Sequence, residues 1–262
     1  MIPKSQEYCY DELVLTTLAH QLHDGDRVFT GVASPVQMMA ILLAKATHAP
    51  RLLYFTILGS VNPTPDKLPY STGDPHLFDN CENAISFPEI FDLANKGRMD
   101  VAFLGGVQID QFGNLNMSII GENYGKPRVR LPGGAGGPIM IRSFRRTIAW
   151  RPNHSRKCLV EKVPFITSPG WIPSAEGTRN GGPDVMVTDL CVFQFDRDTK
   201  RIQLKSIFPE IHIDTIKERT GFQFTISKEI PTWTLPTSEE QEIINTIIDP
   251  KGIRKALLKP PK

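Results

Sequence analysis

Residues 27–58 constrain the fold more than any other stretch, because they predict a strand, a helix and a second strand in succession. Residues 27–31 follow the turn Asp24-Gly25-Asp26 and carry Val28, Phe29 and Thr30, which favour a short strand. Ser34-Pro35 then supplies an N-cap and a proline at the first helical position, and an apolar helix continues to Ala46. Residues 52–58 are almost continuously hydrophobic, as expected for a strand covered on both faces. The stretch therefore predicts a βαβ unit.

Strand-like and helix-like segments also alternate along the rest of the chain. Helices are predicted at 10–23, 87–96, 213–219 and 238–248, and strands at 99–104, 147–151, 163–167, 185–188 and 191–195, the last two as a hairpin. Residues 61–83 hold four prolines among polar residues and predict an ordered loop. The alternation predicts an α/β fold. The length of 262 residues fits one decorated domain or two small ones.

The charge and the distribution of special residues exclude several classes of function. Thirty basic and 28 acidic residues give a net charge of +2, which is too even for a nucleic-acid-binding surface. No apolar stretch approaches the ~18 residues of a membrane span, and the N-terminus lacks the apolar region of a signal peptide. The four cysteines form no C-x-x-C pair, and the histidines show no metal-binding spacing. We therefore expect a cytoplasmic protein without a metal site.

Three glycine-bearing blocks, at 105–116, 133–137 and 167–171, are the strongest candidates for ligand contact, because glycine lets backbone approach a ligand closely. Parallel α/β sheets bind ligands at the carboxyl ends of their strands, where the turns after Phe29, Ile57 and Leu104 are predicted. The blocks match neither a dinucleotide-binding fingerprint nor a P-loop. Tight turns and a mobile loop remain the alternative explanation.

Basic residues flank the second glycine block and suit the phosphates of a cofactor such as coenzyme A. A solvated surface or a subunit contact is the alternative. The residues are Lys126, Arg128, Arg130, Arg142, Arg145 and Arg146.

These blocks, in this order, resemble the β-type subunit of the heteromeric family I CoA-transferases, most closely the glutaconate CoA-transferase type. The resemblance extends from about Leu13 to Lys251. The residues that carry it are 31–35, 48–50, 105–110, 112–116, 126–128, 133–136, 167–171, 220–222 and 248–250.

The resemblance implies a CoA-transferase fold, which is an α/β fold with an open, partly parallel sheet flanked by helices. Residues 1–262 are expected to form a single α/β domain of that type. It also implies a related α subunit as partner, in a heterodimer or heterotetramer, and an acyl-CoA site at their interface. Coenzyme A enters as the thioester substrate, and no permanently bound cofactor is expected.

One position departs from the family pattern. Transferases of this family carry a glutamate just after the second strand, whose carboxylate attacks the thioester, and here Ile57 occupies that position. An isoleucine offers neither a nucleophile nor a proton, so the covalent route to CoA transfer is closed. The nearest carboxylates in sequence, Asp66 and Asp74, occupy no family position. The catalytic residue is therefore not predicted.

Branches of the family that lack this glutamate perform other chemistry on acyl-CoA thioesters. One decarboxylates 3-methylglutaconyl-CoA and carries a cysteine where Ile57 stands, and another opens a ring hydrolytically in steroid breakdown. The resemblance thus favours cleavage of a carbon–carbon bond. CoA transfer with a carboxylate from elsewhere, and a catalytically silent subunit that stabilises its partner, remain the alternatives.

The predicted acyl-CoA site combines the strand-end turns with the glycine blocks. Backbone amides of the glycine loop, with Gln108, Asn114 or Asn116, would bind the thioester oxygen or a developing enolate. Asn114 and Asn116 are equally suited to holding turns. The predicted site residues are Gly31, Ser34, Ile57, Gly59, Ser60, Gly106, Gln108, Asn114, Asn116, Gly133, Gly134, Gly136 and Arg142.

Overall fold

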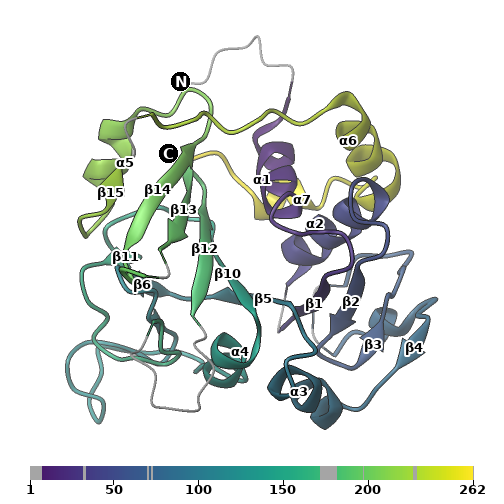
Figure 1. Ribbon diagram of the computed structural model, residues 1–262, viewed down its shortest axis with the longest axis horizontal. Coiled ribbons are helices and arrows are strands. Elements are labelled where there is room, and N and C mark those ends of the chain that lie inside the picture. Colours follow the sequence, from purple (N-terminus) through teal and green to yellow (C-terminus); the bar gives the residue numbers. More distant parts are fainter. Residues whose placement is uncertain are drawn as a thin grey trace. The chain divides into compact units, whose positions relative to one another are not determined.

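The computed structural model describes residues 8–31, 34–69, 71, 73–171, 182–196, 198–226 and 229–261. The chain divides into two compact units (Figure 1). The first comprises Met1–Phe103 and Thr234–Lys262, and the second comprises Leu104–Trp233. The chain passes from the first to the second within strand β5 (Val101–Gly105). A single domain over the whole chain stays a prediction.

The sheet of the first unit is built on the predicted βαβ unit. Strand β1 (Arg27–Thr30) pairs in parallel with β2 (Leu53–Thr56) and, on its other side, with β5. Two short antiparallel strands, β3 (Ser60–Val61) and β4 (Asn83–Ala84), extend the sheet beyond β2. Val28 and Phe29 are fully buried, which agrees with a strand covered on both faces.

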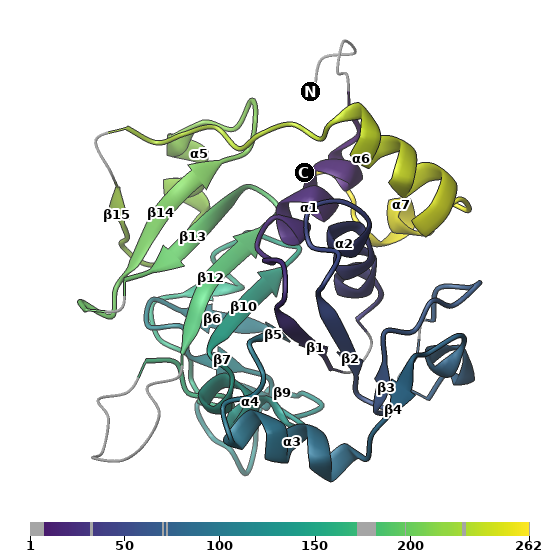
Figure 2. The same ribbon diagram turned by 45° about the vertical axis from the view of Figure 1, so that its right-hand side comes forward.

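Helices from both ends of the chain belong to this unit (Figure 2). Helix α2 (Pro35–Ala46) contacts α1 (Tyr10–Ala19), β1 and α6 (Ser238–Ile243), and most of its residues are buried. Several of the helices begin with sequence-encoded caps, such as Pro35 at the start of α2 and the capping box of Ser86 with Glu89 at α3. The helical elements are α1 (Tyr10–Ala19), α2 (Pro35–Ala46), a 3₁₀ turn (Pro75–Phe78), α3 (Phe87–Asn95), α6 (Ser238–Ile243), a π-helical turn (Ile244–Ile248) and α7 (Arg254–Leu257).

The main sheet of the second unit is mixed. Strand β10 (Arg146–Arg151) pairs in parallel with β12 (Pro183–Thr188), and β12 forms the predicted hairpin with β13 (Cys191–Phe195). Strand β14 (Ile202–Ile207) follows antiparallel to β13, and β15 (Thr225–Ile226) pairs in parallel with β14. Buried residues such as Phe193 and Leu204 fill the core beside this sheet.

Short elements carry the glycine blocks of the second unit. Strands β11, β6 and β7 form one small sheet, and β8 and β9 form another. The elements are β6 (Gln108–Asp110), β7 (Leu115–Asn116), β8 (Ile119–Ile120), β9 (Val129–Arg130), α4 (Gly137–Ser143), β11 (Leu159–Val160) and α5 (Ile213–Arg219).

The structure confirms the α/β fold with an open, partly parallel sheet flanked by helices, and differs from the sequence prediction in detail. The strand predicted at 163–167 is wrong, because Pro164 has no backbone N–H to donate to a neighbouring strand. Next to this segment, Ser168 forms an isolated bridge with Leu115. The second strand ends at Thr56 because Gly59, at φ +99°, turns the chain. The proline-rich stretch 61–83 contains one 3₁₀ turn and contributes to the edge strands β3 and β4.

Candidate functional site

A small cavity of about 20 Å³ lies in the first unit, at the carboxyl ends of β1 and β2. This is the position where parallel α/β sheets bind ligands. Three predicted site residues, Gly31, Ser34 and Ile57, line it. The other lining residues are Thr30, Met38, Tyr54, Thr56, Pro69, Ser71 and Leu77. Val32 and Ala33, in the predicted turn after β1, lie outside the described residues.

Among the described residues, hydroxyl groups supply the polar side chains that line this cavity. The Tyr54 hydroxyl and Thr30 Oγ1 are 2.8 Å apart, and Thr56 Oγ1 lies 2.7 Å from Ser60 Oγ. The parallel register places Thr30 directly beside Thr56. Tyr54 is only 1% exposed, and this burial raises the pKa of its phenol far above the usual value. The hydroxyl is therefore neutral and acts as a hydrogen-bonding group at physiological pH.

Ile57 is the half-buried residue immediately after β2, and a tight turn fixes its position. The Gly59 amide donates to the Thr56 carbonyl at 3.0 Å. A Cβ on Gly59 would lie 1.9 Å from the Ile85 carbonyl oxygen, so only glycine fits this turn. The predicted residues Gly59 and Ser60 thus shape the strand end and bond to Thr56, while Ile57 faces the cavity.

Among the described residues that line this cavity, none is a carboxylate. Asp66 is exposed, and Asp74 accepts a hydrogen bond from the His76 amide at the start of the 3₁₀ turn. Neither of them lines the cavity. The chemistry available here is that of hydroxyl donors and acceptors beside an aliphatic surface.

The three glycine blocks come together in the second unit. A Cβ on Gly170 would lie 2.1 Å from the Phe112 carbonyl oxygen, and the Gly170 amide donates to Asn114 Oδ1 at 2.8 Å. A Cβ on Gly134 would lie 2.5 Å from Thr167 Cγ2. The first and second blocks therefore both pack against the third. Their glycines permit close backbone packing between the blocks.

Asp110 organises the turn within the first block, a role that the sequence did not single out. It is fully buried, and its Oδ1 accepts from the amides of Phe112 and Asn114 at 3.0 and 3.1 Å. The Asn114 side chain donates to Asp110 Oδ2 at 3.0 Å. The sequence signal that could have found this turn is an aspartate four residues before an asparagine, with a glycine between them. In the structure this glycine, Gly113, adopts φ +75°.

Asn116 and Gln108 also bond within the chain. Asn116 Nδ2 donates to Gln108 Oε1 at 2.9 Å and to the Ile119 carbonyl at 2.6 Å, and its Oδ1 accepts from the Ser118 amide. The buried Gly106 precedes this pair. These contacts favour the turn-holding role of the asparagines, and their role in ligand binding stays a prediction.

The glycine loop itself leads into α4. Gly133 adopts φ +93°, and its amide donates to the Met117 carbonyl at 2.7 Å. Gly136 occupies the N-cap of α4, and the exposed Arg142 lies in the last turn of this helix. The cavity residues and the glycine-loop residues thus belong to different units, and each set is ordered by contacts inside its own unit.

A buried histidine in the second unit was also missed by sequence reasoning. His154 is 2% exposed, and its ring nitrogens lie 3.0 Å from Thr188 Oγ1 and 2.8 Å from Thr220 Oγ1. Burial lowers the pKa of His154 to about 3. Burial also raises the pKa of Asp189, which accepts from the His154 amide, to about 6. The neutral ring is a structural hydrogen-bonding group.

Two kinds of feature are absent from the described residues. No group of three or more His, Cys, Asp or Glu side chains in this part of the chain is placed to hold a metal ion. Within the same residues, no helix has both the length and the apolar character needed to cross a membrane.

Known proteins resemble this chain along almost its whole length. One of the subunits of glutaconate CoA-transferase from Acidaminococcus fermentans is 30% identical over 255 residues, covering 93% of each chain. The cholesterol ring-cleaving hydrolase IpdB subunit of Mycobacterium tuberculosis is 25% identical over 249 residues, covering 93% of this chain and 96% of that protein. The crystal structure of the decarboxylase AibA/AibB matches with a TM-score of 0.85 at 34% identity, covering 95% of this chain and 98% of that one. Residues 13–219 match the coenzyme A transferase family, and the chain belongs to this family.

Proposed function

We propose that this chain is the β-type subunit of a heteromeric enzyme acting on an acyl-CoA thioester. We further propose that the enzyme cleaves a carbon–carbon bond of the acyl group, by decarboxylation or hydrolytic ring opening. Transfer of CoA between carboxylic acids is then not the reaction. The observation that carries this proposal is Ile57 at the cavity beside β1 and β2, where a transferase of this family requires a carboxylate.

The cavity lining supports this choice of chemistry. Covalent CoA transfer needs a carboxylate that attacks the thioester carbonyl. The described lining instead offers hydroxyls, such as those of Ser34 and Thr56, beside aliphatic Ile57. When a carbon–carbon bond next to a thioester is cleaved, the electron pair of the broken bond is delocalised onto the thioester oxygen. That step needs hydrogen-bond donors, each worth about 3 kcal/mol when aimed at the developing charge.

The similarities support the same choice. The two proteins described as a decarboxylase and a ring-cleaving hydrolase match this chain over more than nine-tenths of its length. Among the solved structures, the decarboxylase is 34% identical to this chain, against 27% for glutaconate coenzyme A-transferase. We propose decarboxylation as the first reaction to test and ring opening as the second.

The partner subunit follows from the size of the cavity and from the relatives. A cavity of about 20 Å³ holds about one water molecule, so an acyl group does not fit inside this chain's cavity alone. Relatives of this length are described as subunits, and the glutaconate CoA-transferase relative is one of them. We propose that a related α subunit completes the site and supplies the acid or base.

The test uses the chain purified together with its partner subunit. Acyl-CoA thioesters that differ in their acyl group are incubated with the complex, and the products are separated by liquid chromatography and mass spectrometry. We expect carbon dioxide or a ring-opened acyl-CoA with its thioester intact. Treatment with hydroxylamine or borohydride is expected to trap no CoA adduct on this chain. Transfer of CoA to a free acid, with an adduct on this chain, would overturn the proposal.

A further inference from the structure

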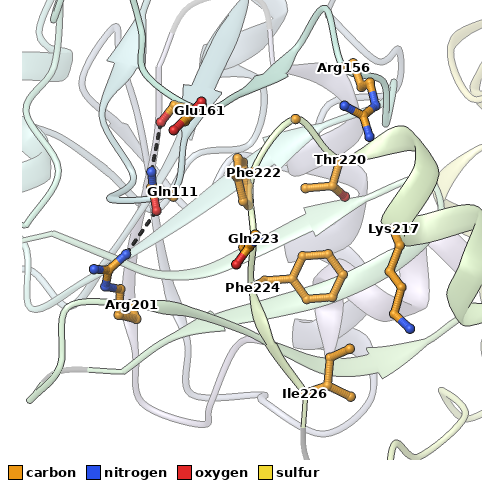
Figure 3. Close-up of a pocket in the computed structure, with 11 residues that line it drawn as sticks. Gln111, Arg156, Glu161, Arg201, Lys217, Thr220, Phe222, Gln223, Phe224 and Ile226 are labelled. Atoms are coloured by element: carbon orange, nitrogen blue, oxygen red, sulfur yellow. Dashed lines mark hydrogen bonds between the residues drawn. The ribbon is translucent and has the colours of Figure 1, made fainter.

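The second unit contains an open pocket of about 610 Å³ that the proposed reaction does not use (Figure 3). Its volume lies in the range of small-molecule sites. Three cationic side chains line it, those of Arg156, Arg201 and Lys217, against the single carboxylate of Glu161. The phenyl rings of Phe222 and Phe224 supply an apolar surface. A pocket with this lining suits an anion that carries a flat apolar group.

The floor of this pocket is held in place by the segment Thr220-Gly221-Phe222, which the sequence singled out. A Cβ on Gly221 would lie 2.2 Å from the Leu159 carbonyl oxygen, and the Gly221 amide donates to that oxygen at 2.9 Å. Thr220 Oγ1 lies 2.8 Å from the buried His154 ring. Phe222 is therefore presented by backbone that cannot shift without losing these contacts.

Hydrogen bonds also position the two arginines. Arg156 Nε donates to the Glu218 carbonyl at 2.6 Å, and among the described residues its two terminal nitrogens have no hydrogen-bond partner. Arg201 donates to Gln111 Oε1 at 3.0 Å, and Gln111 donates in turn to the Glu161 carbonyl at 3.2 Å. An anchored guanidinium with unused donors is well suited to a phosphate group.

Lys217 adds an exposed charge to the side of the pocket that holds Arg156. Figure 3 shows Arg156 and Lys217 to one side of the segment 222–224, and Gln111, Glu161 and Arg201 to the other. Lys217 Nζ lies 3.7 Å from Asp214 Oδ1, an exposed pair that holds the lysine only weakly.

From this arrangement we infer that the pocket binds a phosphorylated nucleotide. The phosphates contact Arg156 and Lys217, and the base lies against the phenyl rings of Phe222 and Phe224. Gln111 and Glu161 offer an amide and a carboxylate to the polar edge of the base. This inference does not rest on the carbon–carbon cleavage proposed above, because its pocket and its test are separate from Ile57.

The test measures binding of ADP by isothermal titration calorimetry to the complex of this chain with its partner subunit. We expect saturable binding below about 1 mM, weakened about tenfold or more by Arg156→Ala and by Lys217→Glu, because each loses a charge-assisted contact. Lys205→Glu is the matched control for Lys217→Glu, since Lys205 is an exposed lysine of β14 that does not line the pocket. If Arg156→Ala lowers the melting temperature, Lys217→Glu still tests the pocket. Lys217 is exposed on α5, so its replacement leaves the core intact.

Two further ligands separate the parts of the inference. Adenosine and pyrophosphate are each expected to bind more weakly than ADP. Pyrophosphate binding as tightly as ADP, or ADP binding that the pocket variants leave unchanged, would overturn the inference. Free CoA serves as a competitor: displacement of ADP identifies the nucleotide end of CoA as the ligand, and no displacement identifies a free nucleotide.

Discussion

At the scale of single residues, we propose that Ile57 marks the difference between this chain and the transferases of its family. We expect Ile57→Glu to introduce a carboxylate at the cavity, beside the hydroxyl groups of Thr56 and Ser34. Partial burial will raise the pKa of this new carboxyl. If the rest of the transfer machinery is present, the variant will form a CoA adduct that hydroxylamine releases.

Ile57→Gln is the matched control for that experiment, because it has nearly the same shape and no nucleophile. The measurement is mass spectrometry of the intact chain after incubation with acyl-CoA. A folded Ile57→Glu complex that forms no adduct would show that this chain lacks more than the attacking group.

Gly59 supports a second prediction at this scale. Gly59→Ala places a Cβ 1.9 Å from the Ile85 carbonyl oxygen and keeps a backbone at φ +99°. We expect a loss of about 3 kcal/mol or more in the free energy of unfolding, measured by urea denaturation. Gly25→Ala is the control, since Gly25 has φ +83° with open space around its Cβ, and it should lose only about 1 kcal/mol. Equal losses in the two variants would contradict the steric explanation.

At the scale of elements, a buried ion cluster joins the two ends of the chain within the first unit. Arg254 of α7 is 1% exposed and contacts Asp11 and Glu12 of α1, at 2.5 and 3.5 Å, and Asp249 at 3.2 Å. Arg254→Met would leave three buried carboxylates without their cation. We expect a loss of about 3–5 kcal/mol in the free energy of unfolding.

Arg51→Met is the control for the cluster, because Arg51 forms an exposed pair with Asp24. Replacement of an exposed partner should change stability little. Urea denaturation of both variants gives the comparison. A stable Arg254→Met protein would show that the carboxylates take up protons or water without cost to the fold.

The elements also show why part of the structure was predictable. Residues 27–58 carry a complete local pattern of strand, cap, helix and strand, so the βαβ unit and its cavity-lining residues Gly31, Ser34 and Ile57 followed from sequence. Strands such as β11 have two residues and no periodicity, and they form through pairing with distant segments such as β6. Tyr54 was missed because the register of β1 with β2, and not its local sequence, brings its hydroxyl to Thr30.

At the scale of the whole molecule, His154 couples folding to pH. Its pKa is about 3 in the folded chain, against about 6.5 for an ordinary histidine, so the unfolded chain binds more protons between these values. Its contribution to stability is complete above pH 6.5 and falls as the pH drops toward 3. Asp189 acts oppositely, because its raised pKa of about 6 makes its contribution largest at low pH and lost as the pH rises through 6.

We therefore expect His154→Gln to be less stable than the wild type at pH 7.5, because glutamine does not reproduce the two hydrogen bonds of the ring to Thr188 and Thr220. The deficit should shrink by about 2–3 kcal/mol at pH 4.5, where the wild type must keep a neutral ring. Urea denaturation at both pH values measures it, with the exposed His23→Gln as control. A deficit that does not change with pH would show that His154 takes up its proton in the folded state.

The close packing of residues 105–116, 133–137 and 167–171 has a consequence for genome annotation. The glycines and asparagines of these blocks contact one another. A gene that encodes all three blocks therefore indicates the family of its product and leaves the reaction unspecified. Catalogues that assign activity from such signatures will merge enzymes whose products differ. On the role proposed for Ile57, the codon after the second strand is a more discriminating marker, because it separates genes that encode an attacking carboxylate there from genes that do not.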